Sequence, residues 1–146
     1  MPRVQPGYAF SIVCDLGFAV GLTAHVTKRM GSFVWIAQPI FDEEPTAADA
    51  ASVGAWRWPT WLPLGAMAHR KLVIPLGVIQ IPEELREYPV MRGGVSRQWR
   101  RVIISEDGTS RIASGEAHPL LPINRAVNDT RLKEMLVSGW KPEDDW

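Results

Sequence analysis

The run GFAVGLTAHVT, at residues 17–27, constrains the fold of this chain more than any other stretch. Apolar residues occupy every second position from Phe18 to Val26, and the residues between them are small or polar. This period of two is typical of a strand with one buried face. Gly21 lies in the middle of the run, where glycine indicates a bulge or a close backbone approach. We therefore expect the core to be built on a β-sheet.

Further strand signals lie on both sides of this run. We expect strands at residues 8–13, 33–41 and 71–81, and a hairpin over residues 97–114 that turns at Asp107-Gly108. The segment FVWIAQPIF (33–41) is apolar on both faces, which predicts a central strand. Pro75 has no backbone N–H, so it places part of the segment 71–81 at an edge or a bulge.

Helix signals are fewer and shorter. Thr46 is expected to cap a short alanine-rich helix, and a second helix is expected over residues 128–140, with Gly139 at its C-terminal stop. Pro82 opens a helical turn at PEELREY. The tail at residues 141–146 is expected to be frayed.

Together these elements predict one α+β domain, mainly β, over residues 1–146. The number and spacing of the strands favour a strongly bent antiparallel sheet or a partly open SH3-like barrel, with short helices and a C-terminal helix. No stretch approaches the roughly 18 apolar residues that span a bilayer. The N-terminus lacks the apolar core of a signal peptide. We therefore expect a cytoplasmic protein without membrane contact.

Residues able to do chemistry are sparse and scattered. His25, His69 and His118 are far apart in the sequence, and Cys14 is the single cysteine. There is no nucleophile elbow, no zinc-binding helix motif and no phosphate-binding or dinucleotide-binding glycine loop. The sequence accordingly assigns no catalytic, metal-binding or cofactor-binding residue, and predicts a protein that is not an enzyme.

Glu83 and Glu84 resemble a general acid–base pair at first sight. As neighbours on a helical turn they project about 100° apart, so their carboxylates do not converge on one space. Acids in the first turn of a helix instead favour the positive end of its dipole. We interpret both as first-turn acids after Pro82.

An arginine-rich stretch supplies an alternative function. Arg92, Arg97, Arg100 and Arg101 surround Trp99, and cations mixed with an aromatic ring can hold nucleic acid by phosphate contact and stacking. In a strand, however, Arg97 and Arg101 share one face and Arg100 lies on the other, which divides the cluster. The net charge of the chain is zero, which provides no overall attraction to nucleic acid. A nucleic-acid-binding module at 97–101 remains the second hypothesis.

Three tryptophans stand close together at Trp56, Trp58 and Trp61, in a proline-rich stretch that we expect to be irregular. Tryptophan is enriched at binding hot spots because it buries a large area and still donates a hydrogen bond. The indoles could instead close one end of the core. Both interpretations stay open, and Trp58 and Trp61 are the pair we expect to be more exposed.

The order of several segments resembles the immunity protein 26 family of bacterial polymorphic toxin systems. The segments are PGYAFSI, LGFAVGLTAHV, FVWIAQPIFDEEP and LGVIQIPEELREYP, and they cover roughly residues 6–92. The PEEL step is the most specific of them. The chain departs from the family pattern in the tryptophan-rich insert at residues 55–63 and in the RQWRR hairpin.

This resemblance implies a protein that protects by binding a cognate toxin and needs no catalytic group. Such binding requires a preorganised and electrostatically complementary surface. The expected partner-binding residues are the acidic corner, which we define as Asp42, Glu43 and Glu44, together with Trp58 and Trp61. An acidic surface would suit a basic, nuclease-like toxin.

Overall fold

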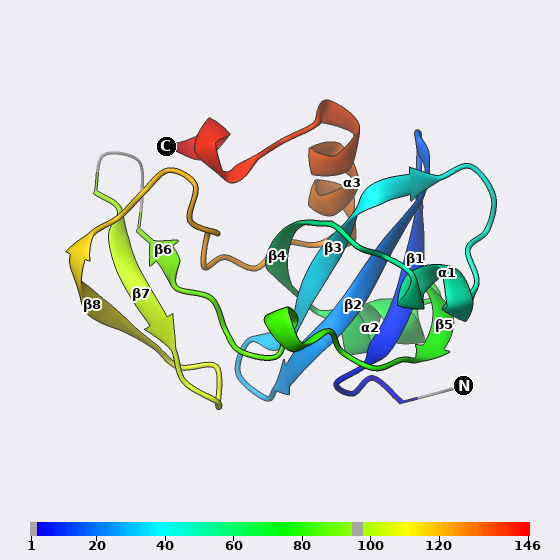
Figure 1. Cartoon of the computed structure of the whole chain (residues 1–146), viewed down its shortest axis with the longest axis horizontal. Helices are drawn as coiled ribbons and strands as arrows, with labels where there is room; N and C mark the ends of the chain where they lie inside the picture. The colour runs from blue at the N-terminus through cyan, green and yellow to red at the C-terminus, as the bar shows by residue number, and fades with distance from the viewer. Residues whose placement is uncertain (1–2, 95–97) are drawn as a thin grey trace.

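A five-stranded antiparallel sheet forms the centre of the protein (Figure 1). The computed structural model describes residues 3–94 and 98–146. The strands of this sheet lie in the order β4-β3-β2-β1-β5. Their bounds are Tyr8–Cys14 for β1, Gly17–Thr27 for β2, Gly31–Phe41 for β3, Trp56–Leu62 for β4 and Ile74–Val78 for β5. β3 thus lies inside the sheet, and β5 with its Pro75 lies at an edge, as the sequence predicted.

A second, three-stranded antiparallel sheet lies beside the first (Figure 1). It consists of β6 (Met91–Gly93), β7 (Arg100–Ile104) and β8 (Ser110–Glu116), in that order. The hairpin between β7 and β8 turns at residues 105–109, where the amide of Gly108 donates to the carbonyl of Ser105. The fold is therefore α+β and mainly β, as expected, and its main sheet is open.

Register shifts bend the main sheet at several points. One separates Ala19 from Gly21 in the pairing of β2 with β3, and another separates Ile36 from Ala37 in the pairing of β3 with β4. An extra residue on one strand bends that strand and increases its twist. A Cβ atom placed on Gly21 would lie 2.2 Å from Cζ of Phe10, so this glycine makes room for an aromatic ring. The expected bulge at Gly21 is thus confirmed, and the group that approaches this glycine closely is the Phe10 side chain and not a backbone.

Helices cover both faces of the main sheet, and their ends carry the expected caps. Thr46 and Asp49 form a reciprocal capping box at α1 (Ala47–Ala51). The side chain of Asn128 caps α3 (Asp129–Ser138), and Gly139 ends it with a φ of 69°. The remaining helices are α2 (Leu64–His69) and the short 3-10 helices η1 (Glu83–Leu85) and η2 (Pro142–Asp145). No helix in the described residues is long and apolar enough to cross a membrane.

The core is divided by the sheet into two layers. On one face, residues of α2 and α3 such as Met67, Leu132 and Leu136 belong to one core cluster with residues of the sheet. On the other face, α1 and η1 cover one part of the sheet, and the second sheet covers the rest. Phe33 of β3 packs there in one cluster with residues of the second sheet. This cluster joins the two sheets.

Two expectations about irregular segments are wrong. The tryptophan-rich stretch at residues 56–62 is the strand β4, paired along its length with β3. The C-terminal tail is not frayed, because Pro142 is buried and residues 142–145 form η2. Both segments gain their order from partners that are distant in the sequence, which local patterns do not reveal.

Candidate functional site

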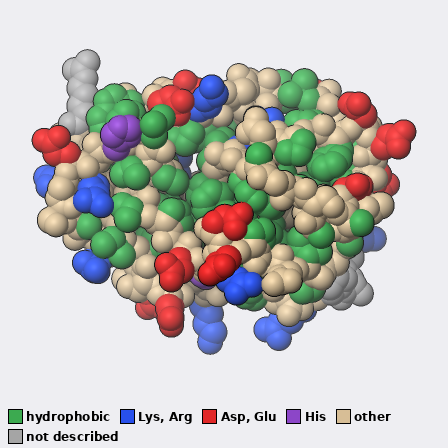
Figure 2. Space-filling model, in the orientation of Figure 1, with side chains coloured by type: hydrophobic (Ala, Val, Ile, Leu, Met, Phe, Trp, Pro, Cys, Tyr) green, Lys and Arg blue, Asp and Glu red, His purple; other side chains and the backbone are tan. Residues whose placement is uncertain are grey.

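The acidic corner lies in the loop between β3 and α1, and its three residues Asp42, Glu43 and Glu44 are exposed. Figure 2 shows acidic side chains at the right-hand edge of the molecule, over this loop. Within the described residues no ion pair involves them. The structure therefore leaves this sequence-predicted group accessible to a partner.

Trp58 and Trp61, the other two predicted partner-binding residues, are not exposed. Their relative exposures are 4% and 0%, so the expectation that they form the exposed pair is wrong. Trp58 Nε1 donates to the carbonyl of Trp140, and Trp61 Nε1 donates to Oδ1 of Asn124. The physical reason is the strand conformation of β4, which directs the two indoles to opposite faces of the sheet, where each enters a core cluster. Tryptophans in this segment do complete the core, as the alternative interpretation held.

A pocket of about 420 Å³ opens beside the edge strand β4. We call it the tryptophan pocket. Three parts of the chain that are far apart in the sequence form its walls. They are the strands β3 and β4, the connector between β8 and α3 (residues 117–128), and the C-terminal segment after α3 (residues 139–146). Its apolar lining consists of tryptophan, proline and leucine side chains, namely Trp35, Trp58, Pro59, Leu120, Pro122, Trp140 and Pro142. This concave, mostly apolar shape is that of a binding site.

Charged and polar side chains surround this apolar lining. Arg57 and Lys141 supply two cations, Glu143 supplies one acid, and Gln38 supplies an amide. Arg57 is half-buried, whereas Gln38, Lys141 and Glu143 are exposed. Polar groups at the border of an apolar pocket are the elements that orient a bound group.

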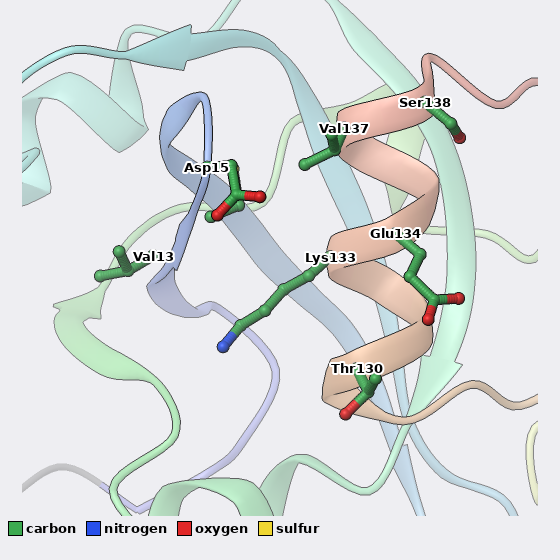
Figure 3. A pocket seen from close by; sticks show the side chains of 8 residues that line it. Val13, Asp15, Thr130, Lys133, Glu134, Val137 and Ser138 are labelled. Carbon is green, nitrogen blue, oxygen red and sulfur yellow. The ribbon is translucent and has the colours of Figure 1, made fainter.

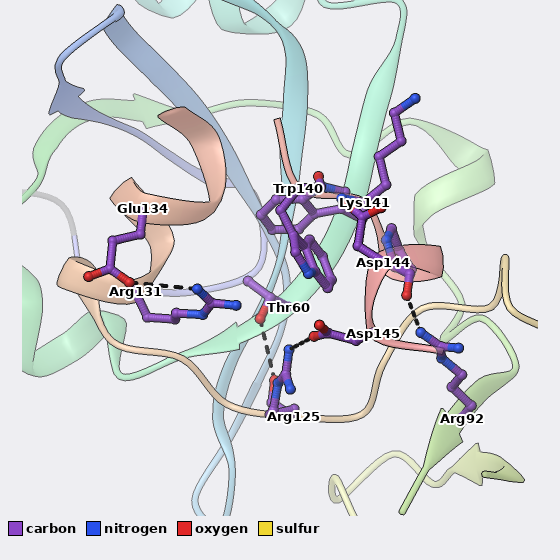
Figure 4. Close-up of polar contacts among 11 residues, drawn as sticks. Thr60, Arg92, Arg125, Arg131, Glu134, Trp140, Lys141, Asp144 and Asp145 are labelled. Atoms are coloured by element: carbon purple, nitrogen blue, oxygen red, sulfur yellow. Dashed lines mark hydrogen bonds and ion pairs between the residues drawn. The ribbon is translucent and has the colours of Figure 1, made fainter. Parts of the chain in front are cut away.

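The C-terminal wall of the pocket is held by a buried arginine. Arg92 has 0% exposure, and its Nη2 donates to the carbonyl of Pro142 (Figure 4). Its guanidinium also lies over two indole rings, 4.4 Å from the centroid of Trp99 and 5.3 Å from that of Trp146. Burial lowers the pKa of Arg92, and the negative charge of Asp145 opposes this shift. The contacts fix residues 142–146 against the second sheet.

An ion pair attaches the same segment to the connector. Arg125 Nη2 lies 2.8 Å from Oδ2 of Asp145 (Figure 4). Burial alone raises the pKa of the Asp145 carboxyl, but the hydrogen bond from Arg125 and the positive charges of Arg125 and Arg131 favour the ionised form and leave this pKa lowered. The connector is itself bonded to β4, because Thr60 Oγ1 donates to the carbonyl of Arg125. An ion pair and a hydrogen bond thus connect the walls of the tryptophan pocket.

A larger cavity, of about 680 Å³, lies between the β1–β2 turn and α3 (Figure 3). Val13 and Val137 line it and are 53% and 42% exposed. Figure 3 shows the Lys133 side chain extending from α3 into this space. Its charged lining residues are the cation Lys133 and the acids Asp15 and Glu134.

The three histidines have different surroundings in the structure. His25 is half-buried and stacks on Tyr88 with ring centroids 3.8 Å apart, while His69 and His118 are exposed. Among the described residues, no group of three or more His, Cys, Asp or Glu side chains could hold a metal ion. Glu83 and Glu84 lie exposed at the first turn of η1, as the sequence predicted.

The arginine-rich hairpin is only partly available. Arg97 lies outside the described residues. Arg100 is exposed, but Arg101 is half-buried and donates through Nη1 to the carbonyl of Ser114. This arrangement leaves few free cations for phosphate groups on the described part of the hairpin.

Sequence reasoning did not find the tryptophan pocket. The only signal was the density of tryptophan and proline between residues 56 and 63, and that signal did not identify Trp35, Trp140 or Arg57 as neighbours. Comparison of the chain with models of known families, with curated proteins and with solved structures finds no significant match. The functional assignment therefore depends on the residues and geometry described above.

Proposed function

We propose that this chain is a non-catalytic binding protein that neutralises a bacterial protein toxin in the cytoplasm. The observation that supports this function best is the closeness of two features in the chain: a tryptophan pocket lined by Trp35 and Gln38 of β3, and an accessible acidic corner directly after β3. The resemblance of residues 6–92 to immunity protein 26 supports the same class of function. Trp61 is no longer part of the proposed surface, because it is fully buried in the core. Trp58 is also buried, and it contributes only as a wall of the pocket.

The spacing of the two features fits one protein–protein interface. Gln38, at the border of the pocket, and Asp42, in the corner, are separated by four positions along the chain. At about 3.3 Å per residue in a strand, this corresponds to roughly 13 Å. An interface of standard size covers about 800 Å² on each partner, which is a patch roughly 30 Å across. One partner can therefore contact both features at once.

The two features also have complementary roles in binding. Exposed carboxylates such as Glu43 and Glu44 attract a basic partner and increase its rate of association. A buried apolar pocket slows dissociation because an inserted side chain loses its contact with water. A neutralising protein needs both, since it must find the toxin quickly and hold it.

Co-expression tests the proposed function. The chain is produced together with a candidate toxin domain, chosen from proteins encoded by neighbouring genes, in a bacterium that this domain kills. We expect growth to be restored, and the two purified proteins to form a complex in size-exclusion chromatography. Continued killing, with both proteins expressed and folded, would contradict the proposal.

The chain offers a matched control for the surface. The double charge reversal Glu43→Lys/Glu44→Lys should weaken protection and affinity. The double reversal Glu83→Lys/Glu84→Lys changes another exposed, adjacent pair of acids by the same charge and should leave protection intact. Equal effects of the two double variants would show that net charge, and not the acidic corner, controls binding.

A further inference from the structure

We propose that the tryptophan pocket receives an apolar, preferably aromatic, side chain of the partner protein together with a carboxylate that neighbours this side chain in the partner's sequence. This inference rests on the proposed function and adds the chemistry of the group that the pocket accepts. It has two parts, namely the apolar part of the pocket and the cations at its border.

The apolar part is rigid before any partner arrives. Trp140 and Trp58 are in edge-to-face contact, with ring centroids 5.3 Å apart and an interplanar angle of 87°. The hydrogen bond from Trp58 Nε1 to the carbonyl of Trp140, at 3.3 Å, holds the same pair. Behind this wall, the bond from Arg92 to the carbonyl of Pro142 anchors the C-terminal segment. A preformed pocket loses little conformational entropy on binding, which favours affinity.

Tryptophan and proline surfaces favour a planar guest. Aromatic rings pack against one another in offset or edge-to-face arrangements that contribute about 0.5–1.5 kcal/mol beyond the burial of area. The lining combines the rings of Trp35, Trp58 and Trp140 with three prolines. A volume of about 420 Å³ lies within the range of pockets that enclose small ligands, so it has room for one large side chain and adjoining backbone.

The charged border favours an acid next to that side chain. Arg57 and Lys141 outnumber the single acid Glu143. Arg57 is half-buried, so its guanidinium is less screened by water than an exposed cation. Arg57 and Lys141 both line the pocket, and each of these side chains carries charged N–H donors. Donors of this kind are satisfied by a carboxylate, which accepts hydrogen bonds only.

The edge strand indicates how the partner contacts the pocket. β4 ends the main sheet, and the connector pairs with it at Trp61, where Val127 N donates to the carbonyl of Trp61. The pocket begins beyond this pairing, at Pro59 and Arg57. Pro59 has no backbone N–H, so an added strand could not form a continuous ladder there. Insertion of a side chain is therefore favoured over strand addition.

The acidic corner and the border of the pocket carry net charges of opposite sign. The corner carries three exposed acids, whereas the border of the pocket carries more cations than acids. A partner with basic residues opposite the corner and one acid opposite the pocket binds in a single orientation. A partner rotated by half a turn would bring like charges together, which opposes binding.

A capped dipeptide tests the inference without any toxin. The probe is acetyl-Phe-Glu-amide, compared with acetyl-Phe-Gln-amide, added to the full chain up to about 10 mM, which fills about nine-tenths of the sites at a millimolar Kd. Two-dimensional NMR of the indole N–H groups follows binding. We expect the signals of Trp35 and Trp140 to shift, and the glutamate probe to bind about threefold more tightly than the glutamine probe.

Three exposed or half-buried positions give variants that preserve the core. Arg57→Gln should make the dissociation constants of the glutamate and glutamine probes about equal. Arg111 is an exposed arginine on β8, and Arg111→Gln should leave the ratio of the two dissociation constants unchanged. Gln38→Trp adds bulk at the exposed border and should abolish binding of both probes. Unshifted Trp35 and Trp140 signals at the highest concentration, or equal affinity for the two probes in the parent chain, would overturn the inference.

These outcomes separate the pocket from the proposed function. If the dipeptide binds as expected but the toxin is not neutralised, the pocket chemistry stands and the proposed function fails. If the toxin is neutralised equally well by the Gln38→Trp variant, the function stands and the pocket is not part of the interface.

Discussion

The guanidinium of Arg92 lies over the ring of Trp99, 4.4 Å from its centroid, with no exposure of Arg92 to solvent. Arg92 belongs to β6, and Trp99 lies directly before β7. A second indole, Trp146, lies 5.3 Å from the same guanidinium. An arginine thus connects the second sheet to the C-terminal segment that forms one wall of the tryptophan pocket.

Replacement of Arg92 should destabilise the fold. Arg92→Ala removes two cation–π contacts and the hydrogen bond to Pro142, and we expect a loss of about 2–4 kcal/mol in the free energy of unfolding. Arg92→Met keeps most of the volume without the charge, so we expect a smaller loss. Urea denaturation followed by tryptophan fluorescence measures both values. Amide exchange at residues 143–145 should accelerate in both variants, and unchanged exchange would contradict the anchoring role.

Substitution of Gly21 should overpack the core. An added Cβ would lie 2.2 Å from Cζ of Phe10, so Gly21→Ala should destabilise the protein by about 1–3 kcal/mol. The double variant Gly21→Ala/Phe10→Leu replaces the ring with a smaller side chain. A double-mutant cycle should then show a favourable coupling between the two positions. Purely additive effects would mean that the ring does not determine the need for glycine.

The cap of the C-terminal helix supports a separate prediction. Oδ1 of Asn128 accepts a hydrogen bond from the backbone amide of Arg131 at 2.8 Å. Asn128→Ala should therefore lower the free energy of unfolding by about 1 kcal/mol. Asn128→Asp keeps an accepting oxygen and should retain most of the stability. Chemical denaturation of the three proteins provides the comparison.

Acidification should destabilise the protein through His25. Burial lowers the pKa of His25 below its ordinary value of 6.5, and the backbone of Arg86 and the charge of Glu106 oppose this shift. Below pH 6.5 the unfolded chain therefore binds a proton at this site more readily than the folded chain does. The contribution of neutral His25 to the free energy of unfolding is fully present above pH 6.5. It is lost as the pH falls from 6.5 toward the pKa of His25 in the folded state.

Two measurements check this pH dependence. NMR titration of the imidazole should give a pKa below 6.5 in the folded protein. His25→Gln should flatten the dependence of the unfolding free energy on pH below pH 6.5. A variant with the same slope as the parent chain would assign the effect to other groups.

Association with the proposed toxin should depend on salt. Exposed charges act over about 10 Å at 0.1 M ionic strength, so Glu43 and Glu44 should speed association mainly at low salt. We expect Glu43→Lys/Glu44→Lys to lower the association rate constant about tenfold at low salt and much less at high salt. Stopped-flow mixing measures the rates. A change confined to dissociation would show that these acids act within the contact itself.

Local sequence patterns determined much of the fold. The alternation from Phe18 to Val26 predicts β2, and the cap before residue 129 with Gly139 after residue 138 predicts α3. Each of these signals depends on neighbours within a few positions, through side-chain period or hydrogen bonds of the backbone. For the same reason the exposed acids of the corner could be identified before the structure.

Only the tertiary structure showed that Trp58 and Trp61 are buried. Trp58 and Trp61 stand in a proline-rich stretch without a clear period, yet pairing with β3 makes that stretch a strand and sends the two indoles into opposite core layers. The order of the C-terminal tail also depends on a distant residue, because Arg92, fifty positions away in the sequence, donates a hydrogen bond to the carbonyl of Pro142. Whether a residue is buried, and where a pocket forms, depends on contacts between segments that are distant in the sequence. The sequence by itself therefore determined which helices and strands form, and the packing of these elements decided which surface is available for binding.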